Sequence, residues 1–151
     1  MTRTWMLRRI KDLGGSIDDL LLVYKLQMRC LTELGCPAWN GALTKKNISD
    51  LERLQKIALK IILGNKYSGY QNALEELKLP TLSDRRIKLC TNFVIKTAKN
   101  PKFASWFTKT KIKTRTSKTY VEHYARTDVY RKSPIFYLTK LLNDSQWRDF
   151  W

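Results

Sequence analysis

The apolar residues of this chain recur at the spacing of an α-helix, and this periodicity constrains the fold more than any other feature. The longest example runs from residue 48 to residue 62, with Ile48, Leu51, Leu54, Ala58, Ile61 and Ile62. Residues three or four positions apart share one face of a helix, so these side chains form a single apolar stripe. Thr44 or Asn47 can cap the start, and Gly64 ends the pattern. A helix that ends near Leu63 is predicted.

Similar stripes, each bounded by a glycine, a proline or a capping residue, occur along most of the chain. Further helices are predicted over residues 3–13, 16–34, 70–78, 82–98 and 134–142. Ser16 is the expected N-cap of the second of these helices, with Asp18 and Asp19 in its first turn, where carboxylates suit the helix dipole. Residues 36–41 are predicted to be a turn, because Pro37 and Asn40-Gly41 oppose a continuing helix.

Residues 108–132 have a different composition, rich in Thr, Lys, Arg and Tyr and poor in aliphatic side chains. We interpret them as an extended basic arm that becomes ordered on binding. The predicted architecture is all-α, a bundle of five or six helices with this extended arm and a C-terminal helix. The predicted division is a helical domain at 1–107, the arm at 108–132, and a C-terminal helix and tail at 133–151.

Positive charge is concentrated in the C-terminal half. The chain has 29 Lys and Arg against 13 Asp and Glu, a net charge of +16. Residues 85–140 contain 15 of the basic side chains and 2 of the acidic ones. Between Arg85 and Val121 no acidic residue occurs. Such an unbalanced field indicates an anionic partner, and nucleic acid is the expected one.

Two groups of basic residues are the candidates for phosphate contacts. One lies at the start of the predicted helix 82–98, and the other alternates along the arm, where an extended chain would align most of its members on one side. The candidates are Arg85, Arg86, Lys109, Lys111, Lys113, Arg115 and Lys118. Tyr120, Tyr124 and Tyr130 interleave with the arm's charges. Packing is the favoured role for these tyrosines, with stacking on unpaired bases as the alternative. Packing is also the role predicted for Trp39 and Trp106.

No catalytic or metal site is expected. The pair Asp18-Asp19 opens a leucine-rich helix, whereas a two-metal site needs carboxylates that converge from separate elements. Cys30, Cys36, Cys90 and His123 lack the paired short spacings of zinc ligands, and no glycine-rich phosphate loop occurs. We therefore expect no cofactor, no metal and no small-molecule substrate.

The sequence also disfavours membrane and secreted classes of protein. No run of apolar residues is long enough to cross a bilayer, and the basic arm has too few apolar residues for a membrane-surface helix. The N-terminus lacks the apolar segment of a signal peptide, and three cysteines make an odd number. An intracellular protein of the nucleus or cytoplasm is expected, with no membrane partner.

Several motifs, in order along residues 3–143, are similar to one family. They include WMLRRI at 5–10, VYKLQMR at 23–29, PAW at 37–39, LERLQKIA at 51–58, IILG at 61–64, YSGY at 67–70, LPTL at 79–82 and YRKSPIFYLT at 130–139. In this order and spacing they resemble the region that follows the palm in jockey-like non-LTR retrotransposon reverse transcriptases.

The resemblance implies a helical thumb and the tail beyond it, which hold the template–primer duplex as it leaves the palm. The chain carries neither the palm nor its aromatic-x-Asp-Asp hairpin, so it is expected to be a fragment without catalytic activity. The expected function is sequence-independent nucleic-acid binding by part of an RNA-directed DNA polymerase. The alternative is a helical protein-interaction module for acidic partners.

Overall fold

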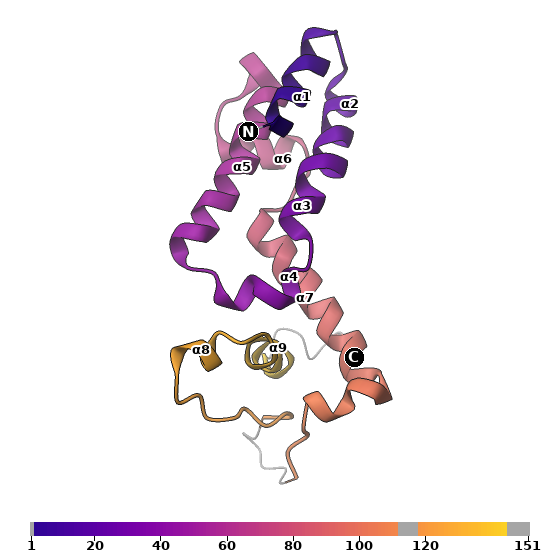
Figure 1. Cartoon of the computed structure of the whole chain (residues 1–151). Helices are drawn as coiled ribbons and strands as arrows, with labels where there is room; N and C mark the ends of the chain where they lie inside the picture. Colours follow the sequence, from indigo (N-terminus) through magenta and orange to yellow (C-terminus); the bar gives the residue numbers. More distant parts are fainter. Residues whose placement is uncertain (1, 112–117, 145–151) are drawn as a thin grey trace. The chain divides into compact units, whose positions relative to one another are not determined.

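The described parts of the protein are mainly helical, with one long non-helical connection between η4 and α8 (Figure 1). The computed structural model describes residues 2–111 and 118–144, and within these ranges it contains helices and no named strand. The predicted all-α fold is confirmed. The elements are α1 (Thr2–Asp12), α2 (Ile17–Val23), η1 (Tyr24–Arg29), α3 (Cys30–Glu33), α4 (Cys36–Trp39), η2 (Asn40–Ala42), α5 (Lys45–Leu63), η3 (Gly64–Lys66), α6 (Tyr70–Glu76), α7 (Leu82–Lys99), η4 (Pro101–Trp106), α8 (Asp128–Arg131) and α9 (Pro134–Asn143).

The long helix α5 begins and ends where its capping residues predict. The Thr44 hydroxyl accepts a hydrogen bond from the backbone N–H of Asn47, at 3.2 Å. At the other end Gly64 has a φ of 56°, a left-handed conformation that favours glycine. The ammonium group of Lys11, on α1, donates to the carbonyl oxygen of Ile61. A side chain from another helix therefore satisfies one of the last carbonyl groups of α5.

The second predicted helix forms as one run of α2, η1 and α3, with a π-helical segment at η1. Its start is a capping box, in which the Ser16 hydroxyl accepts from the N–H of Asp19 at 3.2 Å. The Asp19 carboxylate in turn accepts from the N–H of Ser16 at 3.1 Å. These hydrogen bonds to Ser16 lower the pKa of Asp19. The predicted capping role of this segment is confirmed.

The prediction of a plain turn at residues 36–41 is wrong, because α4 and η2 occupy this segment. Gly35, with a φ of 62°, lets the chain reverse just before α4. Pro37 lies in the first turn of α4, where a backbone N–H has no helical partner and its absence costs little. A proline is therefore compatible with the start of a helix as well as with a turn.

The chain divides into two compact units. The first unit is Met1–Leu34 with Thr44–Arg85, and the second unit is Gly35–Leu43 with Arg86–Trp151. The boundary near residue 85 falls inside α7, whose first turn belongs to the first unit. This grouping differs from the predicted division at residues 107 and 132, because α4, most of α7 and α9 share one core.

The first unit has a core drawn from α1, α2, η1, α5 and α6. The buried members are Leu7, Leu20, Tyr24, Met28, Ala58, Leu59, Ile62, Leu63, Ala73, Leu74 and Leu79. Gln55 is a buried polar member of α5, and its amide donates to the carbonyl oxygen of Pro80 at 3.2 Å. This bond ties α5 to the chain that leads into α7.

The second unit has a smaller core that includes a residue of the predicted arm. Its buried members are Cys36, Cys90, Val94, Phe107, Tyr120, Leu138 and Leu142. The rings of Phe107 and Tyr120 meet edge to face, with centroids 6.5 Å apart. The arm thus contributes an aromatic anchor to this core.

Candidate nucleic-acid interface

Arg85 is held in an ion pair. Its Nε lies 2.6 Å from Oε1 of Glu33, and the same oxygen lies 3.3 Å from Nε of Arg29. About a third of the Arg85 side chain is exposed, while Glu33 is largely covered. Glu33, distant in sequence, is the partner in the structure. Two guanidinium groups share one carboxylate here, so part of the positive charge remains uncompensated.

Arg86 is a correction to the predicted set. Its side chain is fully buried, at 0% exposure, and its Nε donates to Oδ1 of Asn40 at 3.1 Å. Within the described residues its Nη1 has no hydrogen-bond partner. Asn40 also donates from Nδ2 to the hydroxyl of Tyr137, at 2.7 Å. A guanidinium enclosed in this way cannot reach a phosphate outside, so Arg86 is a structural residue of the second unit.

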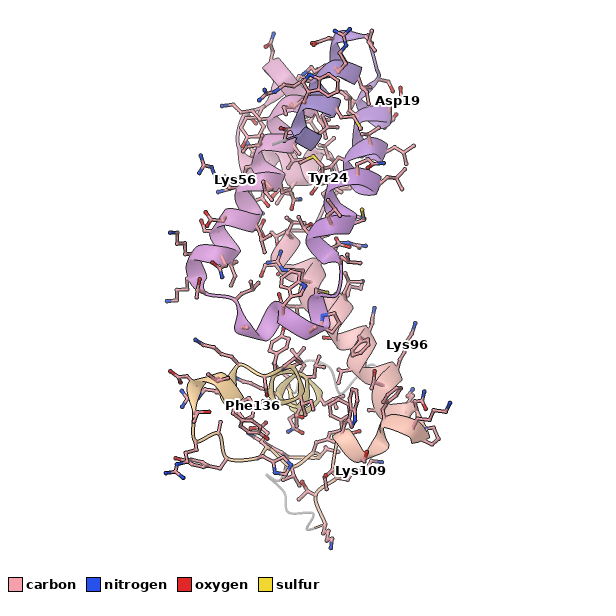
Figure 2. All side chains as sticks on the ribbon, in the orientation of Figure 1. Asp19, Tyr24, Lys56, Lys96, Lys109 and Phe136 are labelled. Atoms are coloured by element: carbon pink, nitrogen blue, oxygen red, sulfur yellow. The ribbon has the colours of Figure 1, made fainter. Side chains whose placement is uncertain are left out.

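The arm brings three of its predicted lysines together on a short hairpin. An antiparallel bridge pairs Lys109 with Tyr120, and two backbone hydrogen bonds flank it, from Thr110 N to Thr119 O at 3.0 Å and from Val121 N to Thr108 O at 2.9 Å. Lys109, Lys111 and Lys118 all have exposed side chains (Figure 2 labels Lys109). Lys113 and Arg115 lie outside the described residues. In its described parts the predicted arm, residues 108–132, is therefore not a single extended strand, because residues 108–110 pair with residues 119–121 and α8 (Asp128–Arg131) is helical.

Asn143, at the end of α9, attaches this hairpin to the second unit. Its amide pairs with both backbone groups of Tyr120, accepting from N and donating to O at 3.0 Å each. It also donates to Oε1 of Glu122 at 3.0 Å. The other carboxylate oxygen of Glu122 lies 2.5 Å from the ammonium group of Lys118. Burial acts to raise the pKa of Glu122, but the hydrogen bonds from Lys118 and Asn143 outweigh it and lower the value.

The aromatic residues considered for packing or stacking differ in how far they are buried. Tyr120 packs in the core of the second unit, as predicted, and Trp39 packs against the same core. Tyr130 lies beside Phe136, with ring centroids 6.1 Å apart. Tyr124 is 91% exposed and Trp106 is 47% exposed. Trp106 packs against Phe103, with ring centroids 4.9 Å apart, although about half of its side chain stays exposed.

A basic stretch along α7 and η4 was not among the predicted contact residues. The side chains of Lys88, Lys96, Lys99 and Lys102 are exposed there, and Figure 2 labels Lys96 on α7. From Lys96 to Lys102 the lysines recur every third residue, a spacing that keeps neighbours close on a helical surface. The same spacing was the available signal in the sequence. It was overlooked because the arm has the denser run of charge.

The described residues give little support to other chemistry. They contain no group of three or more His, Cys, Asp or Glu that could hold a metal ion. Cys36 and Cys90 are buried with their sulfur atoms 3.8 Å apart, and both are free thiols. Burial, and then the neighbouring Cys36, raises the pKa of Cys90 to about 12. A thiol in this state is a poor nucleophile at neutral pH.

A hollow of about 290 Å³ lies in the first unit, beside α6 and the start of α7. Glu75 and Asp84 line it together with Lys78, so its charge is mixed and does not suit a polyanion. Among the described helices, none is long and apolar enough to cross a membrane.

No protein family, no curated protein and no solved structure matches the chain. The functional interpretation therefore rests on the residues themselves and on the motifs given above.

Proposed function

We propose that the chain binds nucleic acid through its phosphates, without reading base sequence and without catalysing a reaction. One observation carries this proposal. The described part of the second unit exposes eleven Lys and Arg side chains and contains three acidic residues. Two of the cations, Lys118 and Arg131, pair with Glu122 and Asp128. A surface with this excess of positive charge suits a polyanion.

Most of the exposed cations have no acid to neutralise them. Within the described ranges no ion pair is formed by Lys88, Lys96, Lys102, Lys109 or Lys111. When an unpaired lysine contacts a phosphate, it displaces cations condensed on the nucleic acid, and the release of these counterions favours binding. These lysines are therefore the main candidates for contact, in place of Arg86.

The kind of cation favours contact with the backbone over the reading of bases. Nine of the eleven exposed cations in this part of the second unit are lysines, apart from Arg126 and Arg131. Lysine presents a flexible point charge, whereas sequence-specific contacts in the major groove mostly use the rigid fork of arginine. Affinity for many sequences is the expected property.

The resemblance to the region after the palm of a non-LTR retrotransposon reverse transcriptase supports the same proposal. In that setting, a helical thumb and tail would hold the template–primer duplex beside a catalytic palm. The proposed role is thus the grip of an RNA-directed DNA polymerase.

The test is direct binding of the full chain to labelled duplexes, RNA–DNA and DNA–DNA, of unrelated sequence. Similar affinities across sequences, and competition by any unlabelled duplex, are expected. Preferential competition by polyglutamate would instead indicate a module for acidic proteins. Primer extension that depends on this chain alone would contradict the non-catalytic part of the proposal.

A further inference from the structure

Three large aromatic side chains on α7 and η4 are exposed. Phe93 is 43% exposed, Phe103 36% and Trp106 47%. They are the only exposed large hydrophobic residues from residue 86 to residue 111 in the described chain. Exposed aromatic rings that cluster on a surface usually mark a binding site.

Two of these rings form a pair whose position is fixed by the core. The centroids of Phe103 and Trp106 lie 4.9 Å apart, with their planes inclined by 57°. The next residue, Phe107, is buried and packs edge to face on Tyr120. Because Phe107 anchors the end of η4, the segment holds Phe103 and Trp106 at the surface without burying them.

The surroundings of this pair are basic. Lys102 immediately precedes Phe103, Lys99 lies three residues before Lys102, and Lys96 lies three residues before Lys99. No acidic residue occurs in the sequence between Arg85 and Val121. Planar apolar faces and cations thus alternate along one short segment of the second unit.

We propose that Phe103 and Trp106 form a stacking platform for the unpaired bases of single-stranded nucleic acid, while Lys96 and Lys102 hold the adjoining phosphates. This inference rests on the proposed function and specifies the ligand of that surface. A single strand offers both an exposed aromatic face on each base and a phosphate between bases, and aromatic–cation surfaces bind it on both counts. A duplex hides the faces of its bases, so only the lysines engage it.

The composition of the patch favours this occupant over an anionic membrane. Membrane-surface helices bury a broad apolar face that includes aliphatic side chains. Here the aliphatic residues of α7, such as Leu89, Val94 and Ile95, pack in or against the core of the second unit. Among the described residues from 86 to 111, the large hydrophobic side chains that are exposed are all aromatic.

The experiment compares three ligands by fluorescence anisotropy at one salt concentration. They are an oligothymidylate, a strand of equal length that has sugar and phosphate but no bases, and a duplex. Wild-type protein is expected to prefer the base-bearing strand over the abasic strand, by about five- to 150-fold for each stacked base. The variant F103L/W106L should bind both single strands equally, at the affinity of wild type for the abasic strand. Its affinity for the duplex should change by less than about twofold, since the phosphate contacts remain.

Control variants separate the possible outcomes. Y124L removes an exposed ring elsewhere in the second unit and should keep the preference for bases. K96Q/K102Q should weaken binding to all three ligands. Thermal unfolding of each variant, followed by circular dichroism, checks that the fold is retained.

Several results would overturn the platform. The platform would be contradicted if F103L/W106L still preferred the base-bearing strand. It would also be contradicted if Y124L lost this preference to the same extent. If F103L/W106L lost binding to phosphatidylserine vesicles while its binding to single strands stayed unchanged, the rings would be assigned to a membrane. In these three cases duplex binding by wild type still upholds the proposed function. If wild type binds none of the three nucleic-acid ligands, the proposed function itself fails.

Discussion

Nε of Arg86 donates a 3.1 Å hydrogen bond to Oδ1 of Asn40, a residue 46 positions earlier in the chain. The pair joins α7 to η2 inside the second unit, and the Asn40 amide continues the link to Tyr137 on α9. A positively charged group is thereby held in the interior by neutral partners. A buried charge destabilises the folded protein strongly when its hydrogen bonds are removed.

The first prediction concerns this buried link. Asn40→Ala removes the partner of Arg86 Nε and should destabilise the protein by about 1.5–3 kcal/mol, the usual contribution of a hydrogen bond to a charged group. Arg86→Met removes the buried charge itself and should restore part of this loss when combined with Asn40→Ala. Urea unfolding followed by circular dichroism measures both effects.

Asn92→Ala is the matched control for this prediction. Asn92 is an exposed asparagine on α7, and its replacement should change stability by less than about 0.5 kcal/mol. If Asn40→Ala behaved like Asn92→Ala, the link between Asn40 and Arg86 would have no structural role.

The second prediction concerns the attachment of the arm. Asn143→Ala removes the two hydrogen bonds to the backbone of Tyr120, and the hairpin should open locally while the helices persist. Limited trypsin digestion should then cut after Lys109, Lys111 or Lys118 faster than in wild type. Equal cleavage rates in the two proteins would mean that Asn143 does not hold the arm.

The third prediction concerns the cysteines. Cys30 is exposed, whereas Cys36 and Cys90 are buried, and burial raises the pKa of Cys90 to about 12. Iodoacetamide attacks thiolates, so in the folded protein it should modify Cys30 quickly and Cys90 only after unfolding. Mass spectrometry of timed samples gives the order, and early modification of Cys90 would contradict its burial.

The Cys90 thiol also makes the stability of the folded protein depend on pH. In the unfolded chain the Cys90 thiol ionises near its ordinary pKa of about 8.5, while in the folded protein it stays neutral up to about pH 12. The unfolded state therefore loses its proton first. The contribution of Cys90 to stability is complete below about pH 8.5 and is lost as the pH rises toward about 12.

Sequence reasoning located most of the helices because the signals for helices are local. Apolar spacing and the capping residues Ser16 and Thr44 lie within the segments that they define, and α5 has the predicted end at Leu63. The prediction of a turn at residues 36–41 is wrong because Pro37 is equally compatible with a turn and with the first turn of a helix.

The candidate interface was harder to predict because exposure depends on distant contacts. Arg86 follows the charged pattern of its neighbours, yet Asn40 and Tyr137 enclose it from elsewhere in the chain. The arm has few apolar residues, yet Asn143 pairs with Tyr120 across 23 positions. Trp106 and Phe107 are adjacent and chemically alike, and only the packing of η4 decides which of them is buried.

The central claim is that the second unit binds nucleic acid through its lysines, and a salt titration with charge-matched variants tests it most directly. The variant K96Q/K102Q/K109Q/K111Q removes four exposed charges from the second unit, and K45Q/K46Q/K60Q/K66Q removes four from the first. Affinity for one generic duplex is measured for both variants and wild type over a range of salt concentrations. The second-unit variant should flatten the slope of log K against log salt by about three to four units, if each lysine contacts a phosphate. The first-unit variant should leave the slope of wild type unchanged. Equal flattening in both variants, or no effect in either, would contradict the assignment of binding to the second unit.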